Sequence, residues 1–261
     1  MLRITTRVDL CGIQERVAGK IITHHYIDKM ANYKLLVPHI EVAEGGHSAD
    51  PDDAALRYGH SGVKAGKLDK RYPNNYIHTN RGVIWGTYTT YKRLLKQEPN
   101  ATEFINLSKE MWLDILKRLY WDKILGDSIK SQPIAEILVE AAWGGGLSSM
   151  VLALQTWLNS KGANLVLDRK MGAKTRDAIN KYVKTAKDEE ELFNKLTQQR
   201  MSYLRGLSTW WKHGKGWTDR VDKLAARAKD LFGDTTAQIG GGALLIAAIG
   251  GYFLYKKYFK A

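Results

Sequence analysis

Residues 33–46 have the sequence YKLLVPHIEVAEGG, and this stretch decides the fold that we expect. Gly45 and Gly46 stand where a helix often ends in a left-handed residue. The residue before them, Glu44, would therefore lie at the end of a buried helix. The helix itself is predicted by apolar residues that recur at helical spacing, which are Leu35, Leu36, Ile40 and Ala43.

A carboxylate in this position can be partly removed from water. Burial raises the pKa of a carboxyl group, and a raised pKa makes a carboxylic acid a usable proton donor at neutral pH. Glu41 lies one turn earlier on the same helix face and is the alternative acid, but no glycines follow it. The simpler interpretation of the stretch is a solvated glutamate before an ordinary helix end.

The composition restricts the classes of partner. The chain has 261 residues and a net charge of +13, which favours a polyanion such as nucleic acid, an anionic membrane or a wall polymer. Its basic residues are spread along the chain without a nucleic-acid-binding motif, so we expect no nucleic-acid partner. Cys11 is the only cysteine and no His-x-x-x-His pair occurs, so we expect no metal site.

The periodicity predicts a mainly α-helical chain with few strands. Residues 47–82 are rich in glycine and turn-forming residues and predict a long loop. Residues 165–179 predict a turn, a possible short hairpin and a helix capped near Thr175. A last helix is expected after Gly214 and Gly216. The other helices are predicted over 83–97, 101–125, 131–143, 147–159 and 189–212.

The two ends of the chain differ from its middle. Residues 1–29 lack the apolar run of a signal peptide, and we expect a weakly ordered extension. Residues 233–238 predict a polar linker. Residues 239–255 are uncharged and rich in small residues, which predicts a transmembrane helix, and a basic tail follows at 256–261.

Several motifs occur in a fixed order along the middle of the chain. Glu44-Gly45-Gly46 is followed by the turn Asp50-Pro-Asp52-Asp53 and by Thr79-Asn80-Arg-Gly82-Val83. Later come Asp168-Arg-Lys-Met-Gly172-Ala-Lys-Thr175, Gln199-Arg200-Met-Ser-Tyr203 and Gly216-Trp217-Thr-Asp-Arg220-Val. Together these motifs resemble the glycoside hydrolase family 108 muramidases, phage-type lysozymes with a C-terminal peptidoglycan-binding region.

The resemblance implies a domain order and shows two differences. It implies a lysozyme-like catalytic domain over 30–146 and a helical peptidoglycan-binding region over 147–232. Residues 54–78 separate two motifs that follow each other quickly in the family, and Arg169 stands where the binding turn has glycine. Both differences concern substrate preference more than the class of reaction.

The resemblance also implies roles for individual residues. Glu44 would be the general acid that protonates the leaving glycosidic oxygen. Asp53 or Asp52 would be the second carboxylate of the pair that glycosidases usually employ. Thr79 is the alternative, as the residue that positions an attacking water. The candidates for lining the sugar cleft are Tyr58, Asn80, Tyr88 and Trp143.

The resemblance implies hydrolysis of the β-1,4 bond between N-acetylmuramic acid and N-acetylglucosamine in peptidoglycan, in phage or prophage lysis. It implies no metal or organic cofactor. The chain would be made in the cytoplasm and attached to the bacterial inner membrane through residues 239–255. Two alternatives remain open: a non-catalytic wall-binding or assembly protein, and a basic membrane-anchored nucleic-acid binder.

Overall fold

The computed structural model describes residues 30–44, 46–48 and 76–236, together with strands at 6–9, 12–17, 20–24 and 63–64. Helices dominate this part of the chain, as the periodicity predicted. Short π- and 3-10-helical turns (η2, Lys117–Trp121; η3, Asp122–Ile124; η4, Gly126–Ser128) follow the helix at Lys109–Leu116. The α-helices are α1 Tyr33–Ala43, α3 Trp85–Leu94, α4 Ala101–Ile105, α5 Lys109–Leu116, α6 Gln132–Trp143, α7 Leu147–Ser160, α8 Ala173–Tyr182, α9 Ala186–Arg205 and α10 Trp210–Thr236.

The described strands form small antiparallel sheets. One contains β1 Thr6–Asp9, β2 Gly12–Val17 and β3 Lys20–His24, in a segment where we expected a weakly ordered extension. A second sheet has the order β4-β7-β8, from His47–Ser48, Thr79–Asn80 and Val83–Ile84, and β5 Val63–Lys64 pairs with β6 Tyr76–Ile77. The predicted loop over 47–82 is therefore partly sheet, and in the second sheet Asn80 pairs with both His47 and Val83.

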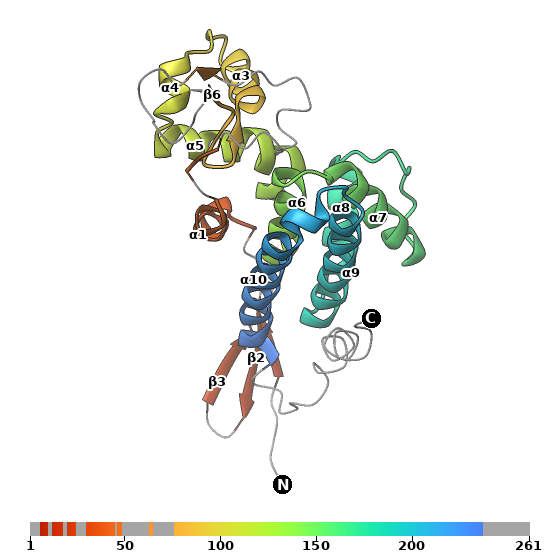
Figure 1. Cartoon of the computed structure of the whole chain (residues 1–261). Helices are drawn as coiled ribbons and strands as arrows, with labels where there is room; N and C mark the ends of the chain where they lie inside the picture. Colours follow the sequence, from red (N-terminus) through yellow and green to blue (C-terminus); the bar gives the residue numbers. More distant parts are fainter. Residues whose placement is uncertain are drawn as a thin grey trace.

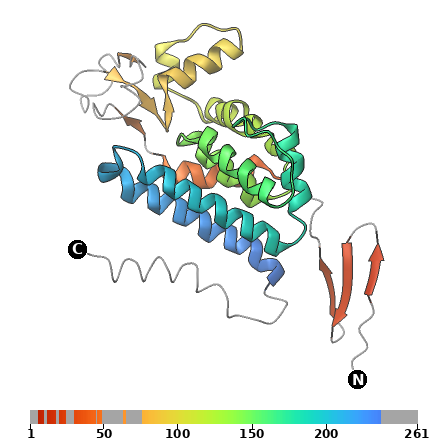
Figure 2. The ribbon, with the colours of Figure 1, turned by 90° about the vertical axis from the view of Figure 1, so that its right-hand side faces the viewer.

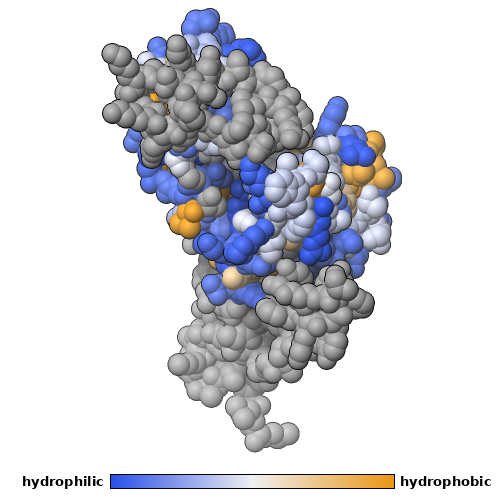
Figure 3. Space-filling model, viewed as in Figure 1, coloured by the Kyte–Doolittle hydropathy of each residue, from blue (hydrophilic) through white to orange (hydrophobic). Residues whose placement is uncertain are grey.

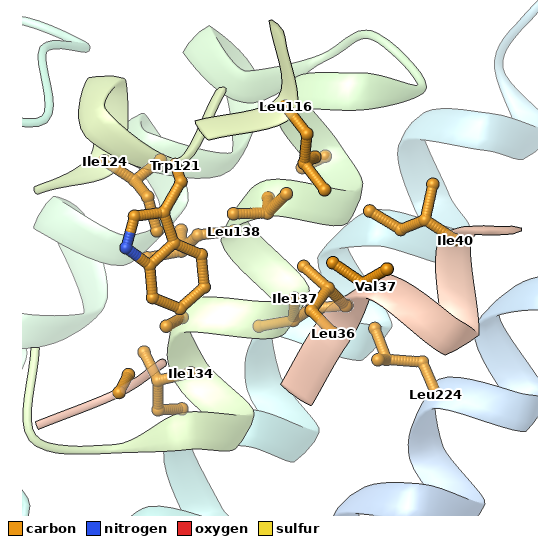
Figure 4. Packing of buried hydrophobic residues seen from close by; sticks show 14 of the residues in the cluster. Leu36, Val37, Ile40, Leu116, Trp121, Ile124, Ile134, Ile137, Leu138 and Leu224 are labelled. Carbon is orange, nitrogen blue, oxygen red and sulfur yellow. The ribbon is translucent and has the colours of Figure 1, made fainter. Parts of the chain in front are cut away.

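The first helix lies between α6 and α10 (Figure 4). Leu36 and Ile40 of α1 are buried with Ile137 of α6 and Leu224 of α10. Burying a side chain of this size contributes roughly 1.5–3 kcal/mol. Because Ile40 lies one turn before Glu44, this packing fixes the direction in which the chain leaves α1.

The helices form two groups with α1 and α6 between them. Figure 1 shows α3, α4 and α5 on one side and α7, α8 and α9 on the other. The pair α9 and α10 forms a helical hairpin that runs along the molecule, as Figure 2 also shows. Helix α10 also contacts α1 and α6. Residues far apart in the sequence can therefore meet at the end of α1.

Capping residues divide the single helix that we predicted over 101–125. The Asn100 side chain accepts a hydrogen bond from the Glu103 N–H and starts α4, whereas Ser108 accepts one from the Met111 N–H and starts α5. Each cap satisfies a backbone donor that lacks an intrahelical partner. The apolar spacing across 107–119 did not indicate that two separate helices, α4 and α5, begin in this region.

The predicted break at Gly214 and Gly216 is also wrong, because α10 runs through both residues. A Cβ atom on Gly214 would lie 2.7 Å from the ring of Trp210, so glycine here allows a tryptophan to lie against its own helix. The break between α9 and α10 lies instead at residues 206–209. At its other end α10 continues to Thr236, so residues 233–236 are helical where we expected a linker.

The helix that we predicted with a cap near Thr175 begins slightly earlier. Helix α8 begins at Ala173 after Gly172, and Thr175 is buried within its first turn. Residues 161–172 contain no strand, so the possible hairpin does not form. The buried amide of Gln155 organises this loop instead, by donating to Asp168 Oδ1 at 2.8 Å and accepting from the Arg169 N–H at 3.1 Å.

Within the described ranges, no helix is both long and apolar enough to cross a membrane. The segment 239–255, for which we predicted such a helix, lies outside these ranges, as does the tail at 256–261. The transmembrane helix therefore remains a prediction.

Candidate active site

Glu44 lies at the wall of a cavity of ≈ 340 Å³. It is the C-terminal cap of α1, with an extended backbone (φ −100°, ψ 128°), and its N–H donates to the Ile40 carbonyl at 3.1 Å. Its side chain is only 15% exposed. The chain therefore turns out of the helix at Glu44 itself. The cavity is lined by Glu41, Glu44, Gly46, Arg81 and Trp112.

A tight turn between β7 and β8 lies against the Glu44 carboxylate. Its two central residues, Arg81 (φ 50°) and Gly82 (φ 73°), both have a left-handed backbone, which is the pattern of a type I′ hairpin turn. A Cβ atom on Gly82 would overlap Glu44 Oε2. Glycine at this position therefore permits both the turn and the close approach of the carboxylate.

Two hydrogen bonds to the backbone of Arg81 hold this turn in place. The Arg81 N–H donates to the Gly46 carbonyl at 3.1 Å, and the Arg81 carbonyl accepts from Trp112 Nε1 at 2.9 Å. Since the first bond joins the turn to the residues after α1 and the second joins it to α5, both walls of the cavity are linked to the helical core.

The other carboxylate oxygen of Glu44 accepts hydrogen bonds from two helices. Trp143 Nε1, at the end of α6, donates to Oε1 over 2.7 Å, and Arg220 Nη1, on α10, lies 3.4 Å from the same oxygen. Among the described residues, no donor reaches Oε2. The two oxygens of Glu44 therefore have different surroundings.

Arg220 belongs to a buried network of charges. Its Nε and Nη2 atoms each lie 3.0 Å from Oε1 of Glu140, a side chain on α6 that is 4% exposed. Arg200 on α9, 1% exposed, pairs with the same carboxylate and donates to the Gly145 carbonyl. The network connects Glu44 to three helices.

Burial raises the pKa of the Glu44 carboxyl above its ordinary value of 4.5. The positive charge of Arg220 and the hydrogen bond from Trp143 oppose this rise in pKa, while the negative charge of Glu140 adds to it. Burial likewise raises the pKa of Tyr120, and the Glu44 charge contributes to that rise. A carboxyl group with a raised pKa can donate a proton nearer to neutral pH.

The structure distinguishes Glu44 from the alternative acid. Glu41 also lines the cavity, but its side chain is 36% exposed and its carboxylate pairs with Lys109 Nζ at 2.9 Å. Glu41 is therefore more exposed to water than Glu44 and is engaged in an ion pair at the edge of the cavity. The desolvated acid at this cavity is Glu44.

Thr79 lies on β7, three residues before Gly82. Its hydroxyl is 2.8 Å from His78 Nδ1, and it pairs with Ser48 and Ile84 in the small sheet. It does not belong to the cavity lining. The structure therefore brings the Thr79 strand to the site, and its role in positioning a water remains a prediction.

Two predicted cleft residues lie in the interior instead. Asn80 is 5% exposed, and its amide donates to the carbonyls of Phe104 and Ile105 at 2.8 and 3.1 Å. Tyr88 is fully buried, and its hydroxyl bonds to Glu103 and to the backbone of Asn100. Because these groups already satisfy polar partners within the fold, neither residue lines a sugar cleft.

The remaining predicted residues divide into two kinds. Trp143 is half-buried and contacts Glu44 directly, so it holds the acid in place. Asp52, Asp53 and Tyr58 lie outside the described residues. Within the described ranges, no cluster of three or more His, Cys, Asp or Glu side chains could hold a metal ion.

Sequence reasoning missed the residues that surround Glu44 from other elements. Gly82 and Arg220 both occur in motifs that we singled out, but nothing in either motif indicates a contact with Glu44. Trp112 has the spacing of a core residue, and it is indeed 1% exposed while it also lines the cavity. The run Gly144-Gly145-Gly146 was a sign of close packing at this turn, because glycines have no side chain and leave room for bulky neighbours. A Cβ atom on Gly144 would overlap the guanidinium groups of Arg200 and Arg220.

Comparisons with known proteins agree with this picture. The sequence model of the family described as Glycosyl hydrolase 108 matches residues 37–146, which extend from α1 to the glycine turn after α6. No curated protein matches the chain. A solved structure entitled "Structure of Brucella abortus SagA" is 24% identical, covers 78% of this chain and 97% of its own, and has a TM-score of 0.57. The likeness to SagA shows a shared fold, and the family model matches residues 37–146 of this chain.

Proposed function

We propose that this protein is a peptidoglycan hydrolase that cleaves the β-1,4 bond between N-acetylmuramic acid and N-acetylglucosamine. The family match supports a glycoside hydrolase acting on peptidoglycan. The observation that carries the proposal is the desolvated Glu44 carboxyl, with its raised pKa, at the wall of a cavity. A neutral carboxylic acid beside a bound glycan is the proton donor that glycoside hydrolysis requires.

The geometry of Glu44 suits general acid catalysis. Oε1 accepts from Trp143 and Arg220, so the proton of the neutral acid resides on Oε2, the oxygen beside Gly82. From there it is transferred to the glycosidic oxygen as the bond to the sugar carbon breaks, and the positive charge that develops on the sugar ring is characteristic of this reaction. Water completes the hydrolysis. We propose that Asp53 or Asp52 assists that water, or that Thr79 positions it.

Digestion of purified peptidoglycan by the full chain tests the proposal. The wild-type protein is compared with Glu44→Gln, which keeps the size of the side chain and the hydrogen bond from Trp143 but cannot donate the acid proton. We expect new muramic-acid reducing ends with the wild type and a loss of at least about 100-fold in Glu44→Gln. Glu41→Gln is the matched control from the same cavity and should retain cleavage.

The other outcomes have definite meanings. Equal cleavage by wild type and Glu44→Gln would move the acid to another residue, with Glu41 next. Wall binding without cleavage by any variant would favour the second candidate, a non-catalytic wall-binding protein. An observation that supports this second candidate is that Glu41, the other carboxylate lining the cavity, is paired with Lys109.

We also propose that the C-terminal helices contact the wall polymer. Trp211 is 81% exposed at the start of α10, and the rings of Trp210 and His213 lie 6.2 and 5.4 Å from that of Trp217. Aromatic rings combine a flat apolar face with a polar edge, which suits sugars. Apart from small hydrophobic patches, the face in Figure 3 is mainly hydrophilic over the described residues. With a net charge of +13, the protein would also be attracted to an anionic wall.

The biological setting is the remaining part of the proposal. A role in phage or prophage lysis is supported by the kind of enzyme found in the resembling family. Attachment to the bacterial inner membrane through residues 239–255 is supported by the 17 uncharged residues of that segment.

A further inference from the structure

The guanidinium group of Arg220 lies between two carboxylates that belong to different helices. Nη1 faces Glu44 Oε1 at 3.4 Å, and the opposite edge, formed by Nε and Nη2, faces Glu140 Oε1 at 3.0 Å. Arg220 and Glu44 are 17% and 15% exposed and Glu140 is 4% exposed. Because a guanidinium group is planar, the two contacts on one edge fix the direction of the third nitrogen.

The surroundings of Arg220 prevent it from turning elsewhere. Arg200 also pairs with Glu140 and anchors that carboxylate from α9. The backbone of Gly144 lies against both guanidinium groups, and any Cβ atom there would overlap them. The position of Arg220 is therefore determined by α6, α9 and the turn after α6, and not by Glu44 itself.

The consequence at Glu44 concerns its two oxygens. Trp143 and Arg220 both donate to Oε1, whereas the described residues place no donor on Oε2. An oxygen that accepts two hydrogen bonds is a poor site for a proton, since the proton would have to displace a donor. The proton of the neutral acid is thereby directed to Oε2.

We propose that Arg220, held by Glu140, is a positioning residue that fixes the Glu44 carboxyl so that Oε2 is the proton-donating oxygen. Helix α10 is then part of the active site, although the family match ends at residue 146. The part of the inference that concerns catalysis rests on the proposed function. The part that concerns the contact by which Arg220 positions Glu44 is independent of the proposed function.

The charged and titratable groups that face Glu44 come from every element around it. The positive charge of Arg220 on α10 is the nearest, and Tyr120 of η2 is close enough for its pKa to depend on the Glu44 charge. Because Arg220 stabilises the ionised form of Glu44, loss of its charge raises the pKa of Glu44. The other groups, which the variants below leave unchanged, are Glu140, Arg200, Glu41 with its partner Lys109, and Arg81 at the cavity wall.

The test combines a direct titration with enzyme kinetics on the full chain. The Glu44 carboxyl is titrated by carbon-13 NMR of glutamate-labelled protein, with its signal assigned from Glu44→Gln. In Arg220→Gln we expect a higher pKa of Glu44, a shift of the alkaline limb of kcat/KM to higher pH, and a kcat about 10- to 100-fold lower because the acid is misplaced. In Arg220→Lys the positive charge remains, so the alkaline limb of kcat/KM should stay at a pH near that of the wild type. The value of kcat should still be reduced.

Arg227→Gln is the matched control. Arg227 lies on the same helix, two turns further on, and pairs with the buried carboxylate of Glu136 at 3.0 Å, but not with Glu44. The substitution removes the same charge from another arginine of α10 that pairs with a buried glutamate of α6. It should lower Tm while leaving the pKa of Glu44 and the pH profile of cleavage unchanged.

The outcomes separate this inference from the proposed function. A pKa of Glu44 that is equal in wild type and Arg220→Gln would overturn the inference, as would an equal shift in Arg227→Gln. If the wild type does not cleave peptidoglycan, the proposed function fails, but the NMR titration still decides whether Arg220 holds Glu44.

Discussion

At the scale of single residues, a glycine on a separate element decides where the Glu44 carboxylate can lie. Gly82 has φ 73° and carries no Cβ, so Glu44 Oε2 can rest against the hairpin turn. The neighbouring Arg81 adopts φ 50°, which costs a residue with a side chain about 1–2 kcal/mol. A left-handed residue at an active-site turn is typical of strain that the surrounding structure maintains.

Gly82→Ala tests this close approach. We expect cleavage to fall by at least about 100-fold, because the new Cβ displaces the carboxyl, and stability to fall by about 1–2 kcal/mol from the left-handed backbone. Peptidoglycan digestion and urea unfolding measure the two effects. The control is Gly216→Ala in α10, where nothing lies within 4 Å, and this variant should gain about 0.5–1 kcal/mol and keep its activity. Full activity in Gly82→Ala would contradict the close approach.

Burial of Glu44 also has a predictable effect on stability. Its pKa is raised in the folded state, so between pH 4.5 and that higher pKa the folded protein binds more protons than the unfolded chain. The contribution of Glu44 is therefore most favourable below pH 4.5 and decreases as the pH rises through this window. We expect Glu44→Gln to be more stable than the wild type at pH 7 and to lose this advantage near pH 4, as measured by urea unfolding. Lower stability of Glu44→Gln at pH 7 would contradict the burial.

At the scale of elements, α6 presents two buried carboxylates to the helical hairpin of α9 and α10. Glu140 pairs with Arg200 and Arg220, and Glu136 pairs with Arg227. Charges this far from water are favourable only when they are paired, so removal of one partner leaves an uncompensated charge. The pair with Glu140 holds Arg220 in position, and the pair between Glu136 and Arg227 attaches a later part of α10 to α6.

Arg200→Met should therefore be strongly destabilising, by about 3–5 kcal/mol, because Glu140 loses its most buried partner. Urea unfolding at pH 7 measures the effect. Lys161→Met is the surface control, since its pair with Glu191 is 36% and 46% exposed and should contribute less than about 1 kcal/mol. Similar losses of stability in the two variants would show that the buried network contributes no more to stability than a surface ion pair.

At the scale of the whole molecule, the region that the family model matches and the C-terminal helices meet at the candidate site. The sequence divided the chain at residue 146, yet Glu44 contacts a residue of α10. The C-terminal helices therefore do more than bind the wall in the proposed function: they complete the surroundings of the acid. A protein made of residues 30–146 alone would lack Arg220 and therefore its contact with Glu44.

The last segment of the chain allows a test at the same scale. Residues 239–255 are uncharged, and we expect them to hold the protein in a membrane. The full chain should remain with membranes after a carbonate wash, whereas a chain ending at Thr236 should be released while retaining its ability to cleave peptidoglycan. Release of both proteins by the wash would show that the segment is not inserted.

Several features of the fold could be predicted from local sequence. The apolar spacing in 33–43 and 131–143 predicted α1 and α6 closely, and Ser131 and Gly144 stand at the ends of α6. Mid-helix glycines misled the prediction for α10, since Gly214 serves to admit the ring of Trp210. Similarly, Asn80 and Tyr88 have polar groups that suit a sugar, but their partners in the fold are distant in sequence.

By itself the sequence determined that this chain is mainly helical and that Glu44 stands at the end of a buried helix, because apolar spacing and helix-ending residues are local properties. Only the tertiary structure decided which residues surround that acid. Trp143 lies 99 residues away and Arg220 lies 176 residues away, and their contacts depend on how α6 and α10 pack against α1. Packing and desolvation act between elements, so the raised pKa of Glu44 and the arginine that opposes it belong to the folded molecule and not to any one stretch of its sequence.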